Sequence, residues 1–276
     1  MKLETVPSQK LPEPVYRVIG EASWQSWTKV AMLVKHMTWR SLASRYRGSA
    51  LGFFWSLVNP VLMMFVYTIV FRYIFDSQIK HFEVYLMTGI LAWNFMSAAA
   101  IQASVTLLSG ASLVNKAAFP RIVLPVSAVL SNAVNYVVAL PLLLLFVLLS
   151  GIQLTAYVLL LPVALLLMIM IATGLGAFLA TLMPFFQDLQ HLIEVFFVMW
   201  FFLTPIVYDI GLIHDPWRRK LYSMNPMVGV IQLVHSVFLG RPLPVGSLAV
   251  AVAGSLGILA VGLLVFRRFA KHCTEV

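Results

Sequence analysis

The sequence contains little charge and almost no cysteine. Only 11% of its 276 residues are charged and just 10 are acidic, whereas soluble domains average about 25% charged residues. Cys273 is the only cysteine, which excludes an internal disulfide framework and a zinc site built from several thiolates. The dipeptide Gly-Lys does not occur, so the chain lacks the phosphate-binding P-loop and cannot hydrolyse a nucleotide by that route.

What the sequence has in excess is apolar surface. Hydrophobic residues make up 61% of the chain, and the mean hydropathy is +0.92. A soluble core of this size could not bury so much apolar surface, so the composition predicts an integral, all-α membrane protein. The formal charge of +9 would suggest nucleic-acid binding in a soluble protein. Here it is better explained as a topology signal, and we expect membrane lipids but no nucleic acid as partners.

Long uncharged runs predict six membrane-spanning helices within residues 47–266, since one crossing needs about 20 apolar residues. The run of 66 residues at 122–187 is too long for one crossing and predicts two, with a break at Ser150–Gln153. The fifth span is expected from near Asp188 to Tyr208. Spans one, two and six come from shorter runs of 24, 32 and 25 residues, at 48–71, 84–115 and 242–266.

The distribution of Lys and Arg predicts that both termini are cytoplasmic. With the N-terminus inside, 13 of the 19 cationic residues fall on cytoplasmic segments and 6 on external ones. The polar residues 1–23 and the last residues, 267–276, are then expected to form cytoplasmic tails, the first of them flexible.

Residues 24–46 are predicted to form an amphipathic helix at the membrane surface. Trp24, Trp27 and Ala31 follow helical spacing on one side, and basic residues occupy another: Lys29, His36 and Arg40. A helix packed against a partner protein would show the same pattern, and both interpretations can hold together.

Residues 221–240 complicate the count of spans, because they also form an uncharged run long enough to cross. The run is interrupted by residues that we take as candidates for a gate: Asn225, Pro226, Gln232 and His235. We therefore expect short re-entrant helices within an external segment at 209–241, entering the membrane without crossing it. Such a break is tolerated only where protein or a water-filled cavity covers it, as at the mouth of a pore.

Ionisable residues near the spans are too few for a catalytic centre. Asp188, His191 and Glu194 fall within about 120° of one helix face, but carboxylate-bridged metal bundles need paired motifs on several helices. We expect neither metal nor catalysis, and an intramembrane enzyme stays the alternative. Small residues at four-residue spacing predict close helix contacts around Gly176 and Gly257.

Aromatic residues near the ends of spans one and five are candidates for lining a pore that passes sugar rings. An aromatic belt at the membrane interface is the alternative, and it is favoured for Trp55 and Tyr208. The candidate lining residues are Phe54, Trp55, Tyr67, Trp200, Phe201 and Tyr208.

Four stretches carry a resemblance that covers almost the whole chain after residue 24: RYRGSALGFFWSLVNPVLMMFVYTIVF (45–71), LVNKAAFPRIVLP (113–125), FQDLQHLIEVFFVMWFFLTPIVY (186–208) and NPMVGVIQLVHSVFLG (225–240). In this order they resemble the permease subunits of ABC transporters that export O-antigen, capsule or teichoic acid. The resemblance implies a homodimer with two ATPase subunits, which would hold ATP and Mg²⁺, so this chain itself would need no cofactor. It also implies a glycan carried on polyprenyl diphosphate in the bacterial inner membrane. Exporters of teichoic acid, of small hydrophobic compounds or of heme are the alternatives.

Two sets of residues acquire roles from this resemblance and from their positions. The cytoplasmic segment 110–121 is expected to dock on the ATPase through Asn115, Lys116, Phe119, Pro120 and Arg121. Arg45, Arg47 and the backbone at Gly48 are expected to approach the diphosphate at the cytoplasmic interface. Anchoring of the topology by positive charge is the alternative for the two arginines.

Overall fold

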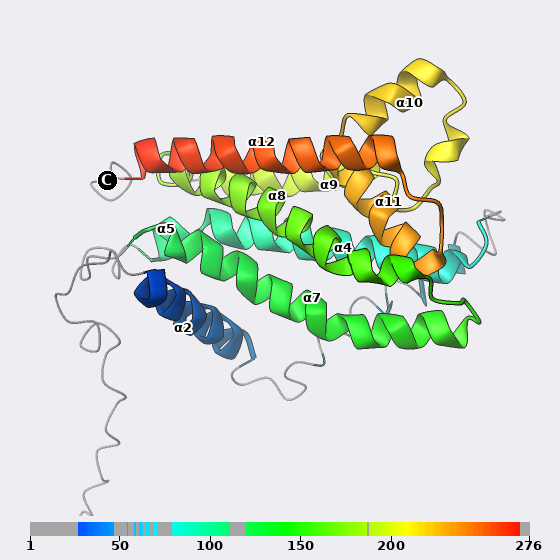
Figure 1. Ribbon diagram of the computed structural model, residues 1–276. Helices are drawn as coiled ribbons and strands as arrows, with labels where there is room; N and C mark the ends of the chain where they lie inside the picture. The colour runs from blue at the N-terminus through cyan, green and yellow to red at the C-terminus, as the bar shows by residue number, and fades with distance from the viewer. Residues whose placement is uncertain are drawn as a thin grey trace, which may run out of the picture.

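The computed structural model describes residues 27–46, 79–110, 120–186 and 188–270, with a few single positions between 54 and 70. The described residues form helices and no strands, which confirms the all-α class (Figure 1). The elements are α2 (Trp27–Tyr46), α4 (Phe82–Ser104), α5 (Thr106–Ser109), α7 (Val123–Leu149), η3 (Ala156–Leu160), α8 (Leu161–Leu182), α9 (Leu189–Phe202), η4 (Ile210–Leu212), α10 (Pro216–Ser223), α11 (Pro226–Leu239) and α12 (Val245–Phe269).

Four helical stretches in the described part of the chain are long and apolar enough to cross a membrane: Phe82–Ser104, Val123–Leu149, Ala156–Leu182 and Val245–Phe269. The predicted break between spans three and four is confirmed, because α7 ends at Leu149 and Gly151 takes a left-handed φ of 70°. The predicted first span lies largely outside the described residues. At 14 residues, α9 is only about 21 Å long, so residues 203–208 would have to complete a crossing there.

The core of the bundle is built around α4. In its most apolar window 83% of residues are buried, against 17% for α12, so α4 is central while α12 presents most of its surface outward. Helix α8 crosses α12 at a point where two glycines meet. A Cβ on Gly262 would lie 2.0 Å from the carbonyl oxygen of Gly174, whereas one on Gly257 would meet nothing within 4 Å. The spacing of small residues predicted a close contact at Gly257, and this prediction is wrong. The close contact of α12 with α8 is at Gly262.

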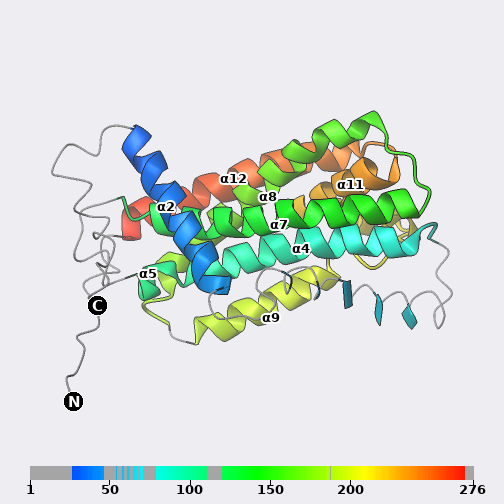
Figure 2. The same ribbon diagram turned by 90° about the horizontal axis from the view of Figure 1, so that it is seen from below.

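The two ends of the bundle differ in what covers them. Helices α2 and α5 lie at one end together with the C-terminal end of α12, and α10 and α11 lie at the other (Figures 1 and 2). We call them the inner and outer ends, following the orientation predicted from the charges. At the inner end α2 packs against α7, with Leu33 buried and Ala31 exposed. At the outer end α11 is a short helix, as expected, and 11 of its 14 residues are buried in the bundle.

Candidate functional site

A network of polar side chains ties α2 to α4 and α7 at the inner end. Arg45 donates from Nη1 to Oδ1 of Asn132 at 3.1 Å and from Nη2 to Oε1 of Gln102. Asn132 Nδ2 donates to the same Gln102 oxygen at 2.6 Å, and Ser41 Oγ donates to Ser131 Oγ at 3.2 Å. We call these five residues the inner cluster. Both acceptors of the Arg45 side chain are neutral amides, so these bonds hold the guanidinium in place without neutralising its charge.

A cavity of about 280 Å³ lies next to the inner cluster. Its lining holds one cation, Arg40, and polar side chains that already donate hydrogen bonds within the protein: Ser41, Ser44, Gln102, Thr106, Ser109 and Ser127. The charge of Arg40 favours an anionic ligand such as a phosphate group. The lining includes Arg40 and not Arg45, which lies five residues further along α2.

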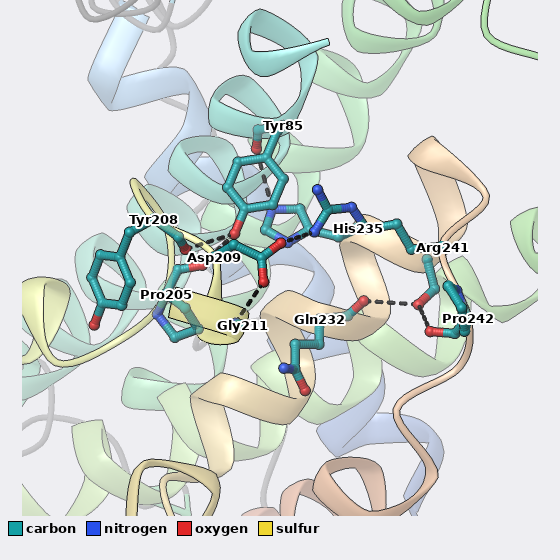
Figure 3. A network of polar contacts seen from close by, with 10 residues as sticks. Tyr85, Pro205, Tyr208, Asp209, Gly211, Gln232, His235, Arg241 and Pro242 are labelled. Carbon is teal, nitrogen blue, oxygen red and sulfur yellow. Dashed lines mark hydrogen bonds and ion pairs between the residues drawn. The ribbon is translucent and has the colours of Figure 1, made fainter. Parts of the chain in front are cut away.

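The outer end carries a second polar network, the outer cluster, made of Tyr85, Asp209, His235 and Arg241 (Figure 3). The ring of Tyr85 stacks on His235 with 3.8 Å between centroids, and the guanidinium carbon of Arg241 lies 4.7 Å from the same centroid. The Tyr85 hydroxyl donates to the carbonyl of Tyr208 at 2.8 Å. This cluster joins the first turn of α4 to α11, to the loop that follows α9 and to the loop that follows α11.

Charge in the outer cluster is compensated. Asp209 accepts a hydrogen bond from the backbone N–H of Gly211 at 2.8 Å and forms an ion pair with Arg241. Burial raises the pKa of Asp209, but these two donors together outweigh burial and hold the pKa below its ordinary value. His235 lies on α11, outside the four candidate spans. Burial and the nearby Arg241 charge lower its pKa to about 3, so its imidazole is neutral.

The four candidate gate residues have distinct places around α11. Asn225 caps the helix by accepting from the N–H of Met227 at 3.0 Å, and Pro226 is the first helical residue. Gln232 lines a cavity beside the outer cluster, and His235 belongs to that cluster. These positions give each residue a structural role, and the gate stays a prediction.

The candidate lining aromatics of α9 pack inward around Trp93 of α4. Trp200 and Phe201 lie edge-to-face with Trp93, at centroid distances of 5.7 and 5.8 Å, and Trp200 Nε1 donates to Asn225 Oδ1 at 3.1 Å. Tyr208 donates from its hydroxyl to the carbonyl of Phe202 at 2.9 Å. The exposed face of α9 carries other large apolar side chains, including Phe196 and Phe202, and the pore lining stays a prediction.

Several predicted site residues lie outside the described residues. They are Arg47, Gly48, Trp55, Tyr67, Asn115, Lys116 and Phe119. Phe54 is described and is exposed. In the docking segment, Pro120 begins the described part, and Arg121 donates from Nη1 to the carbonyl of Ala270, which ties the segment to the end of α12.

The three ionisable residues at the start of α9 are exposed: Asp188, His191 and Glu194. Across residues 27–46, 79–110, 120–186 and 188–270, no group of three His, Cys, Asp or Glu side chains could hold a metal ion.

Sequence reasoning missed both clusters as units. Gln102 and Asn132 could have been noticed, because amides inside apolar runs mark contacts or functional positions in membrane helices. Asp209 and Arg241 are 32 residues apart in loops, and no local pattern indicates their pairing.

Apolar helices of spanning length with polar clusters at both ends define a multi-pass membrane protein. The profile of the ABC-2 type transporter family matches residues 32–239, and the chain belongs to that family. It is therefore a transport subunit, and its family implies an ABC ATPase partner.

The relatives are similar along most of their length. The chain is 34% identical over 206 residues to the O-antigen export system permease protein RfbA of Myxococcus xanthus, covering 74% of this chain and 79% of the relative. It is 24% identical over 241 residues to a protein of the same name from Klebsiella pneumoniae, covering 87% of this chain and 93% of that one.

Proposed function

We propose that this chain is the channel-forming permease of an ATP-driven exporter that moves a lipid-linked, O-antigen-like polysaccharide across the bacterial inner membrane. The observation that carries the proposal is the similarity to O-antigen export permeases, at 34% identity over 206 residues in one case. Four helices of spanning length supply the membrane body that such a permease needs.

In the proposed arrangement the chain crosses the membrane six times and both termini are cytoplasmic. The excess of Lys and Arg on the inner segments supports this orientation. The first span would come from residues 48–71, and α9 with the turns after it would supply the fifth.

The glycan would be taken up by its diphosphate at the inner end. Arg45 has five N–H donors, and the bonds to Asn132 and Gln102 use two of them. The remaining donors, together with Arg47 and the backbone at Gly48, would bind phosphate oxygens. The neighbouring cavity with Arg40 supports this location, because it adds a cation.

Two copies of this chain would assemble with two ABC ATPase subunits that hold ATP and Mg²⁺. Segment 110–121 would contact the ATPase, and its attachment through Arg121 to the end of α12 offers a mechanical connection to the bundle. Aromatic side chains would line the path of the glycan, and the external segment 209–241 would close it from outside.

The test is export in cells that synthesise the glycan. Deleting the gene for this chain should abolish surface O-antigen and leave lipid-linked glycan on the cytoplasmic side. Co-expressing the chain with its ATPase should restore surface glycan, whereas an ATPase with an inactivated P-loop should not. Unchanged surface glycan in the deletion strain would contradict the proposal, and accumulation of a teichoic-acid precursor instead would change the substrate.

A further inference from the structure

A cavity of about 250 Å³ lies beside the outer cluster, and the proposed gate does not explain what occupies it. Side chains from distant parts of the chain line it. They include Tyr85 of α4, Asp209 and Arg241 of the loops, Arg219 of α10, and Gln232 and Ser236 of α11, most of which appear in Figure 3. The cavity is therefore a product of the folded outer end and not of one local motif.

The charged groups of this cavity leave an excess of hydrogen-bond donors. Both carboxylate oxygens of Asp209 are already used, one by the N–H of Gly211 and the other by Arg241. The lining holds two guanidinium groups, those of Arg219 and Arg241, and one carboxylate, which pairs with Arg241. The charged side chains therefore sum to one positive charge, which Arg219 carries. A ligand here must bring acceptor oxygens, and a negative charge would be favoured.

One acceptor in the lining lacks a partner. The side-chain oxygen Oε1 of Gln232 is buried and forms no hydrogen bond among the residues that the structure describes. A buried acceptor without a donor is unfavourable, so a turn of this amide towards the cavity, where a ligand hydroxyl group could donate to it, would be favoured.

The cavity offers no free aromatic platform. The ring of Tyr85 already stacks on His235 and contacts the guanidinium of Arg241. Recognition would therefore depend on polar contacts rather than on ring stacking. At 250 Å³, the volume is slightly below the range of about 300–1,000 Å³ for pockets of drug-sized ligands, which suits a single sugar unit.

We propose that this outer cavity binds an acidic sugar unit, with the carboxylate on Arg219, whose charge no acidic side chain of the lining balances, and with a hydroxyl group donating to Gln232 Oε1 once that amide turns towards the ligand. Guanidinium groups bind carboxylates in a planar, two-bond geometry, which gives the selectivity for an acid over a neutral sugar. The inference rests on the proposed function, because an exported glycan would bring such units to the outer end.

The test measures binding of radiolabelled glucuronate to the full chain in lipid nanodiscs by equilibrium dialysis. Binding should be saturable, and Arg219→Gln should weaken it about tenfold or more, the loss expected for a charge-assisted hydrogen bond. Arg218→Gln is the matched control. Arg218 directly precedes Arg219 on α10, but it pairs with Asp215 at 3.3 Å and is absent from the cavity lining. Arg218→Gln should therefore leave the affinity for glucuronate unaltered.

Two competitors separate the possible ligands. Glucose lacks the carboxylate and inorganic phosphate lacks the sugar, so both should displace glucuronate much less well than unlabelled glucuronate does. Absence of saturable binding, equal binding by Arg219→Gln, or equal displacement by either competitor would overturn the inference. If the wild-type chain exports O-antigen but binds no glucuronate, only this inference is overturned. If the chain does not export O-antigen, the proposed function is overturned.

Discussion

The inner and outer clusters each contain an arginine that connects separate elements, but the partners of the two arginines differ in charge. At the inner end Arg45 donates to the neutral amides of Gln102 and Asn132. At the outer end Arg241 pairs with the carboxylate of Asp209 and lies over the ring of Tyr85. The outer arginine is thus compensated, and the inner one keeps a charge that an anion can use.

The difference separates a structural arginine from one that can also bind a substrate. Removing Arg241 leaves a half-buried carboxylate without its partner, which is costly for folding. Removing Arg45 leaves only neutral groups, so its loss should affect stability less and anion binding more. The contrast also requires that both ends belong to one bundle, which depends on the contact between α8 and α12.

The largest effect is expected where α8 crosses α12. Gly262→Leu would place a Cβ 2.0 Å from the carbonyl oxygen of Gly174, and we expect a loss of about 3 kcal/mol in the free energy of unfolding. Gly257→Leu is the control, because a Cβ there meets nothing within 4 Å. Thermal unfolding of the purified chain in detergent measures both, and equal stability of the two variants would refute the described contact.

Arg241→Gln should have the next largest effect, about 2 kcal/mol, because it removes the ion pair and the contact with the Tyr85 ring. Arg218→Gln breaks a more exposed pair with Asp215, with side chains 77% and 47% exposed, and should cost at most about 1 kcal/mol. Chemical unfolding of both variants checks the order. A smaller loss for Arg241→Gln would mean that the outer arginine is not structural.

Arg45→Lys should cost about 1 kcal/mol, because the lysine cannot bridge two amide acceptors in one plane. Export of lipid-linked glycan should fall by more than the loss of stability explains, when membrane levels are matched and the ATPase is assembled. Lys35→Arg, at an exposed position of the same helix, is the control. If Arg45→Lys exports at the wild-type level, both alone and combined with Arg47→Lys, the two arginines only anchor the topology and do not bind the diphosphate.

The smallest effect concerns pH at the outer cluster. The pKa of Asp209 is lowered in the folded chain, so its stabilisation is present above the unfolded value of about 3.9 and is lost as pH falls through the folded value. The stability difference between wild type and Asp209→Asn should be constant from about pH 7 to 5 and shrink below about pH 4. Its size should stay below about 1 kcal/mol, since the pair is partly exposed. A difference that disappears near neutral pH would contradict the assignment.

The sequence predicted the helices better than the contacts between them. The break near Gly151 was predictable because a polar, glycine-containing stretch interrupts an apolar run of 66 residues. The choice of Gly262 over Gly257 was not, since spacing marks a helix face without showing which neighbour approaches it. The outer ion pair was also hidden, because only the fold brings Asp209 and Arg241 together.

The contrast between the two ends depends on their lying on opposite sides of the membrane. In a Cys273→Ser background, Ser109→Cys probes the inner end and Lys220→Cys the outer end, and both positions are exposed. A membrane-impermeant maleimide added to intact spheroplasts should label Lys220→Cys at once, and Ser109→Cys only after permeabilisation. Labelling of Ser109→Cys from outside, or protection of Lys220→Cys, would contradict the orientation and with it the proposed direction of transport.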